Sequence, residues 1–268
     1  MNGPKAAVGS EETFLTSLLE RPLAPQDPEV VGAIESGPMD SQLAVPLGAV
    51  DRLLDPEPLP AETGWAQMPD ATGYIAVRTP MPAVTAEMVD WWFDWHPRSS
   101  LRYRVWHPQA HTANSVDVPK VSGAMAHWGT VHHPVEDVGT GSVRARISFV
   151  SPTEVGFSTN AVDDPNVATI VCGRVGDHDR HAEHSLMAHV WLNDGQGGTV
   201  LRSHFWLGSV IRPDLPGALG DLAGKLVNRP FVRRKIMPEG LPQSLVRHCA
   251  EEYTNLAAIL PELHAKFA

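Results

Sequence analysis

The segment from Leu241 to Leu260 has the pattern of one long helix, and it follows a run of segments with strand-like sequences. Pro242 suits the first turn of a helix, where its missing N–H is not needed. An apolar stripe at roughly helical spacing runs along the segment, through Leu245, Cys249, Leu256 and Ile259. Strands followed by one long amphipathic helix indicate an α+β fold, in which a curved antiparallel sheet wraps the helix and encloses a pocket.

The expected strands are rich in apolar and β-branched residues and are separated by turn signals. The first, 73–79, precedes a helix that begins after Thr85, continues through Phe93 and ends before Pro97. A glycine-rich turn that starts at Asn193 is expected to join the last two strands as a hairpin. The remaining strands are expected at 101–106, 143–150, 154–159, 168–172, 185–192 and 199–206.

The N-terminal part of the chain differs from the rest because prolines divide it into short pieces. Helical spacing of apolar residues appears within 14–19, 30–34 and 45–54. We therefore expect an N-terminal helical region and linker over residues 1–62, and a larger second domain over 63–268. The alternative for the first of these is a poorly ordered tail.

The composition excludes several classes of protein. The chain has 268 residues, with 21 Lys and Arg against 31 Asp and Glu, and its net charge of −10 disfavours nucleic acid as a partner. No stretch approaches the ~18 to 20 consecutive apolar residues of a membrane span, so no membrane association is expected. Two cysteines, Cys172 and Cys249, are too few for a disulfide framework, and acids stand where a signal peptide has its apolar core. We therefore expect a cytoplasmic protein.

The strongest local signal for chemistry lies on the last helix. The chain has 13 histidines, and imidazole is both a common metal ligand and a proton carrier near pH 7. His248 and Glu252 are four residues apart, so both side chains leave the face that also carries Leu245 and Leu256. Such a pair in an apolar stripe is costly unless it is paired, protonated or bound to a cation. A partly solvated ion pair is the alternative, and Glu251 competes with Glu252 as a neighbour of the imidazole.

A second cluster of polar residues occupies 131–137. In an extended chain His132 and Glu136 share one face, whereas His133 lies on the other. One acid of this cluster could therefore reach a pocket while its neighbours stay in solvent.

Three other segments are ambiguous. Residues 103–114 mix aromatic rings, imidazoles and an amide, which suits either the wall of a ligand pocket or the end of an amphipathic strand. The histidine-rich segment 177–184 has few apolar residues and is interpreted as a solvated loop. The only basic run, 233–235, is interpreted as a solvated turn. Nucleophile-elbow, HExxH, P-loop and dinucleotide-binding motifs are absent from the sequence.

Together these segments resemble the diacetylphloroglucinol and phloretin hydrolases, zinc-dependent enzymes that cleave a carbon–carbon bond between an acyl group and a phloroglucinol ring. The resemblance runs from about Gly64 to the C-terminal helix and rests on GYIAVRTPMPAVTAEMVDWWFDWHP, LRYRVWHPQAH, HHPVEDVG, LRSHFWLG and RHCAEEYTNL. It implies a Bet v 1-like helix-grip fold with a small N-terminal helical appendage. It also implies a homodimer formed through the N-terminal helices.

The resemblance implies a set of site residues as well. The zinc ligands would be His111, Glu136, His248 and Glu252. Tyr103, Asn114 and His189 would orient the substrate and take part in catalysis with Glu136. His204 stands where a second pocket tyrosine is expected, which would alter the phenol-binding part of the pocket.

The expected activity is hydrolysis of 2,4-diacetylphloroglucinol, or a related small acylphenol, to the deacylated phenol and a carboxylic acid. Two imidazoles and two carboxylates suit Zn²⁺, although iron or manganese would also fit such a set. Two alternatives use the same fold without this chemistry: a polyketide cyclase or aromatase, and a non-catalytic carrier of aromatic ligands.

Overall fold

The structure is a computed structural model that describes residues 8–117, 125, 127–179, 182–213, 215–238 and 240–268. Among these residues, eleven strands form one antiparallel sheet, and eight of them follow the order β1-β2-β10-β9-β8-β7-β5-β4. In addition, β11 pairs with β9, and β3 joins the sheet through β6 and β7. The strands are β1 (Gly64–Gln67), β2 (Gly73–Met81), β3 (His111–Ala113), β4 (Val116–Asp117), β5 (Val131–His132), β6 (Val135–Asp137), β7 (Ser142–Val150), β8 (Val167–Asp177), β9 (Ala182–Asn193), β10 (Thr199–Leu207) and β11 (Arg212–Pro213).

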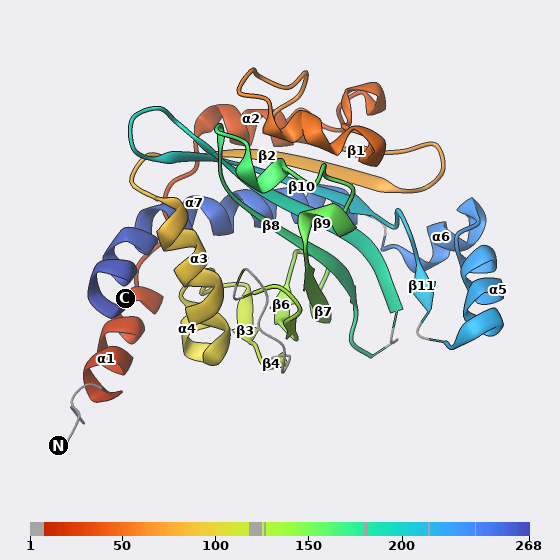
Figure 1. The fold of residues 1–268 in the computed structure, drawn as a ribbon. Helices are drawn as coiled ribbons and strands as arrows, with labels where there is room; N and C mark the ends of the chain where they lie inside the picture. Colours follow the sequence, from red (N-terminus) through yellow and green to blue (C-terminus); the bar gives the residue numbers. More distant parts are fainter. Residues whose placement is uncertain (1–7, 118–124, 126, 180–181, 214, 239) are drawn as a thin grey trace.

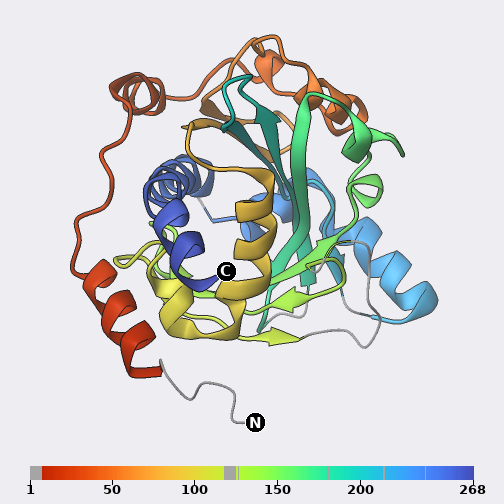
Figure 2. The same cartoon turned by 60° about the vertical axis from the view of Figure 1, so that its left-hand side comes forward.

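A long C-terminal helix, α7, lies along the inner face of the curved sheet (Figure 1). It packs mainly on β2, and α3 lies against both α7 and β8 on the same side (Figure 2). This arrangement confirms the predicted α+β helix-grip fold. The helices are α1 (Val8–Leu19), α2 (Pro28–Glu35), η1 (Ser41–Leu43), η2 (Leu47–Leu54), α3 (Ala86–Trp95), η3 (His96–Arg98), α4 (Ser100–Arg104), η4 (Pro152–Glu154), η5 (Ala161–Asp163), α5 (Gly217–Val227), α6 (Pro230–Ile236) and α7 (Leu241–Phe267), where η marks 3₁₀ helices.

The two faces of the sheet carry separate hydrophobic cores. Along β2, Ile75 and Val77 point to the inner face and join the core formed with α3 and α7. Tyr74 and Ala76 point to the outer face, where they join a second core with η2. Alternation along each strand therefore decides which side chains can reach the cavity under α7.

Helix α7 is longer than its sequence pattern predicted, because it continues through Pro261 to Phe267. A proline inside a helix removes one backbone hydrogen bond. Packing favours the extension, since Leu263 is buried and the Phe267 ring stacks on Trp95 at 5.6 Å between ring centroids.

Two predicted strands are wrong. Residues 101–106 include helix α4 instead, because the Ser99 hydroxyl caps it by accepting from the backbone N–H of Leu101. Residues 154–159 begin at the end of the short helix η4, at which the Ser151 backbone N–H donates to the Glu154 carboxylate in a capping box. In both places a local cap outweighs the alternating pattern of the sequence.

The predicted helical pieces of the N-terminal region are confirmed as α1, α2 and η2, with η2 of the 3₁₀ type. Leu15 and Leu18 of α1 are buried in the inner core. The division of the chain at residues 62 and 63 stays a prediction. None of the helices in the described part of the chain combines the length and apolar composition that a membrane span requires.

Candidate metal centre and substrate cavity

Helix α7 carries two of the four polar side chains that converge in the interior, at the place called the centre below. His248 and Glu252 are both buried on its inward face, and His248 Nε2 lies 3.7 Å from Glu252 Oε2. Leu256, one turn further along the same stripe, is also buried. The i, i+4 spacing in an otherwise apolar stripe therefore places an imidazole and a carboxylate side by side in the interior.

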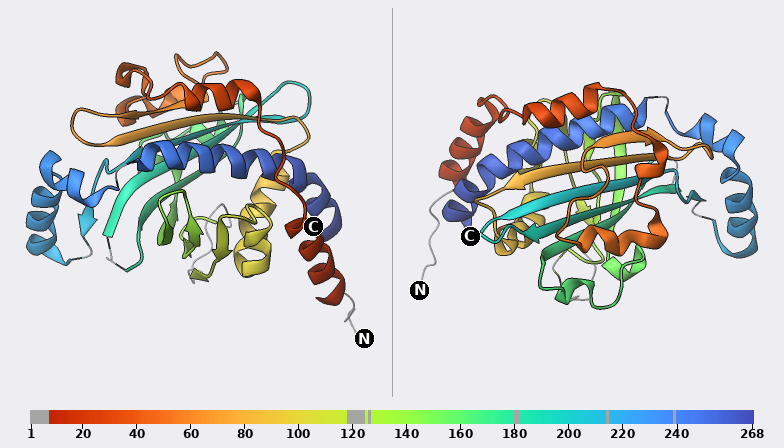
Figure 3. Two further views of the ribbon diagram at one scale, coloured as in Figure 1. Left: turned by 180° about the vertical axis from the view of Figure 1, so that it is seen from behind. Right: turned by 90° about the horizontal axis from the view of Figure 1, so that it is seen from above.

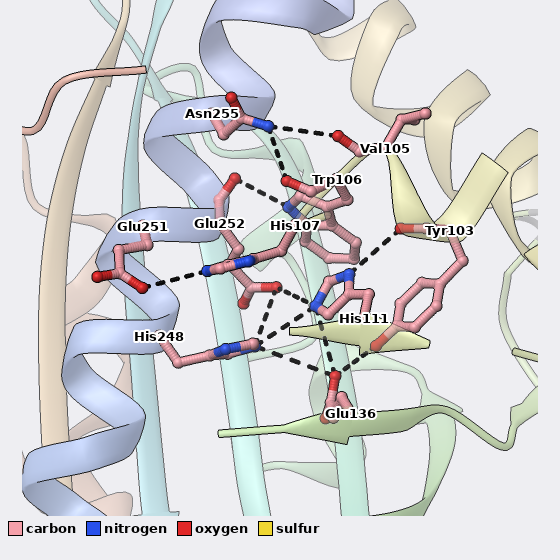
Figure 4. A network of polar contacts seen from close by, with 10 residues as sticks. All are labelled: Tyr103, Val105, Trp106, His107, His111, Glu136, His248, Glu251, Glu252 and Asn255. Carbon is pink, nitrogen blue, oxygen red and sulfur yellow. Dashed lines mark hydrogen bonds and ion pairs between the residues drawn. The ribbon is translucent and has the colours of Figure 1, made fainter. Parts of the chain in front are cut away.

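The pairing of two short strands supplies the other two side chains. Antiparallel pairing of β3 with β6 sets His111 directly opposite Glu136. His111 Nε2 lies 3.5 Å from Glu136 Oε2, 3.5 Å from Glu252 Oε2 and 3.4 Å from His248 Nε2 (Figure 4). Ligand atoms of His111, Glu136 and His248 all lie within 4.8 Å of one another. All four predicted ligands are thus brought together.

The protonation of these groups fits a site built for a cation. Burial lowers the pKa of His111 to about 4 and that of His248 well below its usual value, so both imidazoles are neutral. Burial raises the pKa of Glu136 and raises that of Glu252 to about 8. Two buried carboxylates without a compensating charge are costly, whereas a divalent ion would stabilise them as carboxylates beside neutral imidazoles. The donor set of two nitrogens and two oxygens fits Zn²⁺.

Contacts around the centre hold two of these side chains in place. His111 Nδ1 lies 3.2 Å from the carbonyl oxygen of Tyr103, so its Nε2 faces the centre. The Tyr103 ring stacks on the His111 ring at 4.1 Å between centroids, and its hydroxyl donates to Glu136 Oε2. Burial raises the pKa of Tyr103 well above its usual value, so the phenol keeps its proton and remains a donor.

The segment that follows α4 is tied to α7. The Trp106 Nε1–H donates to the backbone carbonyl of Glu252 at 3.0 Å. The Asn255 side-chain amide donates to the backbone carbonyls of Val105 and Trp106 (Figure 4). These contacts hold α7 against the segment that leads into β3. Two of the candidate metal ligands lie on α7, and a third lies on β3.

The competition between Glu251 and Glu252 has a structural answer. Glu251 is half-exposed, and its Oε2 lies 3.1 Å from His107 Nε2. The His107 ring stacks on His248 at 5.1 Å between centroids, with an angle of 8° between the rings. Glu251 therefore supports a neighbour of the centre, and Glu252 faces the centre itself.

A cavity of about 330 Å³ opens beside the four candidate metal ligands. Tyr103, Asn114 and His189 line it together with Glu136, His248 and Glu252. Apolar side chains from α3, the sheet and α7 form most of the remaining wall, among them Phe93, Ile147, Met187, Phe205, Leu241 and Leu245. An aromatic guest would therefore contact apolar walls and reach a few polar groups at the centre.

His189 stands on β9 and reaches the cavity from the inner face. Its Nδ1 lies 2.9 Å from Ser203 Oγ, which orients the ring, and burial lowers its pKa to about 3. Asn114 Oδ1 is buried with no partner within the described residues. A neutral imidazole and an unpaired amide oxygen are both suited to accept hydrogen bonds from hydroxyl groups of a ligand.

The structure corrects the expectation that His204 contacts substrate. His204 lies on the outer face of β10, fully buried, with Nδ1 2.6 Å from the Tyr74 hydroxyl. Its neighbours Ser203 and Phe205 point to the inner face, and Phe205 lines the cavity. Side chains alternate along a strand, so a placement that is wrong by one residue moves the side chain to the opposite face.

Two further histidines line the cavity and were not assigned a role from the sequence. His96 and His132 lie with their rings 5.6 Å apart between centroids, and His132 Nε2 is buried with no partner among the described residues. For His132, the sequence did contain a signal, because it shares one face of an extended chain with Glu136. For His96, at the end of α3, no pattern in the sequence indicated that its side chain lines the cavity.

Comparison with known proteins identifies the family of the chain. A family model described as the DAPG hydrolase PhiG domain matches residues 45–265. The chain belongs to the DAPG hydrolase family. A phloretin hydrolase from Eubacterium ramulus is 32% identical over 280 residues, which cover 98% of this chain and 94% of that protein. A 2,4-diacetylphloroglucinol hydrolase from Pseudomonas protegens is 30% identical over 252 residues, which cover 88% of this chain and 79% of that protein.

Solved structures outside the DAPG hydrolase family also align with the chain, at low identity. Norcoclaurine synthase from Thalictrum flavum aligns over 74% of this chain and 88% of its own, with 11% identity and a TM-score of 0.37. The Zhui aromatase/cyclase from Streptomyces aligns over 72% and 96%, with 14% identity and a TM-score of 0.39.

Proposed function

We propose that this protein is a zinc-dependent hydrolase that cleaves the carbon–carbon bond between an acyl group and a phloroglucinol-type ring. The observation that carries the proposal is the convergence of His111, Glu136, His248 and Glu252, of which the last three line a largely apolar cavity. Relatives at about 30% identity are named as hydrolases of phloretin and of 2,4-diacetylphloroglucinol, which supports the same reaction class.

The proposed reaction consumes one water and one acylphenol, such as 2,4-diacetylphloroglucinol or phloretin. It forms a carboxylic acid from the acyl group and returns a hydrogen to the ring carbon. A bound divalent ion would act as a Lewis acid on the acyl carbonyl and would favour ionisation of the attacking water.

The residues of the chain would handle the protons of this reaction. A bare aryl carbanion is too basic to leave, so the ring must take a proton at carbon and become a ketone before the bond breaks. Neutral His189 would accept the proton of a ring hydroxyl and deliver it to the ring carbon as that ketone forms, while Tyr103 and Asn114 hold the neighbouring oxygens. Glu136 or Glu252 would take the proton from water and return it to the enolate oxygen of the ring when the bond breaks. General acid–base assistance of this kind contributes about 10²- to 10⁴-fold to rates.

The buried carboxylates argue against a role as a carrier. An apolar ligand gains nothing from Glu136 and Glu252, and each costs free energy in the interior unless a cation is present. A homodimer and a cytoplasmic location stay predictions.

Metal analysis coupled to a turnover assay tests the proposal. The purified protein should contain about one zinc per chain, and it should release acetate from mono- or diacetylphloroglucinol, or the corresponding acid from phloretin. The His248→Ala variant should lose metal and activity together. A His248→Ala protein that keeps its full zinc content would contradict the ligand assignment, and a zinc-loaded wild type without turnover would contradict the reaction.

A further inference from the structure

The helices α5 and α6 (residues 217–236) project from one end of the molecule, on the opposite side from α1 and the C-terminus. Figure 1 and both views in Figure 3 show this placement. These two helices, called the α5–α6 unit below, are held to the rest of the molecule by polar contacts. The Asn228 side chain donates to and accepts from the backbone of Ile211, and Arg233 Nη1 donates to the backbone carbonyl of Asp70 at 2.8 Å. These contacts fix the orientation of the unit from the side that faces the sheet.

The other side of the unit presents a stripe of large apolar side chains to solvent. The spacing of 215, 219, 222 and 226 places four leucines on one face of α5 and its preceding turn. These leucines are between 47% and 68% exposed, and Phe231 of α6 is 61% exposed. Exposed apolar surface of this extent usually marks a contact with a partner or a lipid surface.

The charge of the unit is opposite to that of the whole chain. Residues 217–236 carry five cationic side chains against one acid, a net charge of +4 in a chain whose net charge is −10. Lys225, Arg229, Arg234 and Lys235 are exposed. A symmetric contact between two copies of this surface would bring like charges together, whereas an anionic surface would be attracted to it.

We infer that the α5–α6 unit docks the protein on an anionic lipid surface, with the leucine stripe entering the boundary between headgroups and acyl chains. Amphipathic helices with apolar side chains on one face and basic side chains beside them bind lipid surfaces in this way. The basic run at 233–235, interpreted from sequence as a solvated turn, lies instead in helix α6. Arg233 is buried and anchors the unit, and its two exposed neighbours would face the lipid.

The unit also flanks the cavity. Ile211, which precedes β11, and Met237 and Pro238, directly after the unit, all line the cavity wall. A docked protein would therefore hold this wall next to the lipid phase, where apolar aromatic compounds collect. The inference goes beyond the proposed reaction, because docking needs neither metal nor turnover.

Co-sedimentation of the full chain with phosphatidylcholine vesicles, with and without phosphatidylglycerol, tests the inference. We expect binding to the anionic vesicles at low ionic strength, with loss of binding as salt is added. Replacing two cations in Arg234→Gln/Lys235→Gln should weaken binding about 25-fold, since each basic side chain near such a surface contributes about fivefold. Arg52→Gln, an exposed arginine on the outer-face helix η2, is the matched control and should have no effect.

The apolar stripe is tested separately. Leu222→Glu/Leu226→Glu should abolish sedimentation with anionic vesicles, whereas Val162→Glu, at a side chain that is 46% exposed elsewhere, should not. Thermal unfolding establishes that each variant is folded. Failure of the wild type to bind anionic vesicles, or equal binding by the Arg234/Lys235 variant, would overturn the inference. So would a wild-type dimer that the leucine variant converts to a monomer, because the stripe would then be a contact between two copies. The His248→Ala protein should bind vesicles normally, which separates this test from that of the reaction.

Discussion

The carboxyl group of Glu252 gives a quantitative test of the buried centre in the metal-free protein. Its pKa is raised by burial from an ordinary value of 4.5 to about 8. The folded state therefore holds a proton that the unfolded state releases between these two pH values. Stability from this group is complete below pH 4.5 and falls as the pH rises toward 8. A difference of this size corresponds to a loss of about 5 kcal/mol of unfolding free energy across the range.

The substitution Glu252→Gln replaces the carboxyl with a neutral group of the same shape, so this pH-dependent loss should disappear. Urea unfolding of chelator-treated wild type and variant, at several pH values from 4.5 to 8, measures the effect. The titrations of the neighbouring histidines contribute to both proteins and largely cancel in the difference. Between pH 4.5 and 8, the unfolding free energy of the variant should rise by about 5 kcal/mol relative to that of the wild type.

Glu251→Gln is the matched control, because it removes the same charge one residue earlier on the same helix. Its side chain is 43% exposed and faces His107, so the change should cost less than about 1 kcal/mol at every pH. Unfolding curves in which the Glu252→Gln and wild-type proteins differ by a constant amount across the range would refute the buried placement of this carboxyl. Saturating zinc should raise the stability of the wild type strongly and that of Glu252→Gln much less.

Three further predictions concern the cavity and the outer face. Tyr103→Phe keeps the ring stacked on its histidine but removes the donor to Glu136, so kcat/KM should fall about 10²-fold with metal content unchanged; a parallel loss of metal would contradict this division. His189→Ala should lower kcat/KM by about 10²- to 10⁴-fold without changing the metal content of the protein. Near-normal turnover of this variant would exclude a role of His189 in proton transfer. His204→Leu should leave KM unchanged but lower the unfolding free energy by about 1–3 kcal/mol, since the buried Tyr74 hydroxyl loses its partner; a raised KM would return this residue to the substrate site.

The sequence predicted some parts of the site from local physics and others only through resemblance. The pair His248 and Glu252 is visible in helical periodicity, because a long stripe fixes which side chains point inward. The contributions of His111 and Glu136 depend on the register of two strands of three residues each, which are too short to leave an alternating pattern. Their place in the ligand set came from the family motifs.

Two predictions made from the sequence failed for different physical reasons. The strand predicted at 101–106 became a helix because Ser99 caps it, and the alternation of that segment carries no information on capping. His204 was assigned by counting along the chain, but the parity of β10 within the sheet turns its side chain outward. The first outcome depends on a cap just outside the segment, and the second on the pairing of strands distant in sequence. The alternation of residues within one segment reports neither.

The amide oxygen of Asn255 accepts a hydrogen bond from the backbone N–H of Ala24 at 3.2 Å, while its amide nitrogen holds the chain that leads to β3. Arg21 also pairs with Glu262 on the same helix. Shortening the N-terminus past Ala24 for expression or crystallisation would thus leave a buried amide only half satisfied, three residues from Glu252. A truncated protein with poor metal retention should therefore be compared with the full-length chain before the loss is ascribed to the ligands themselves.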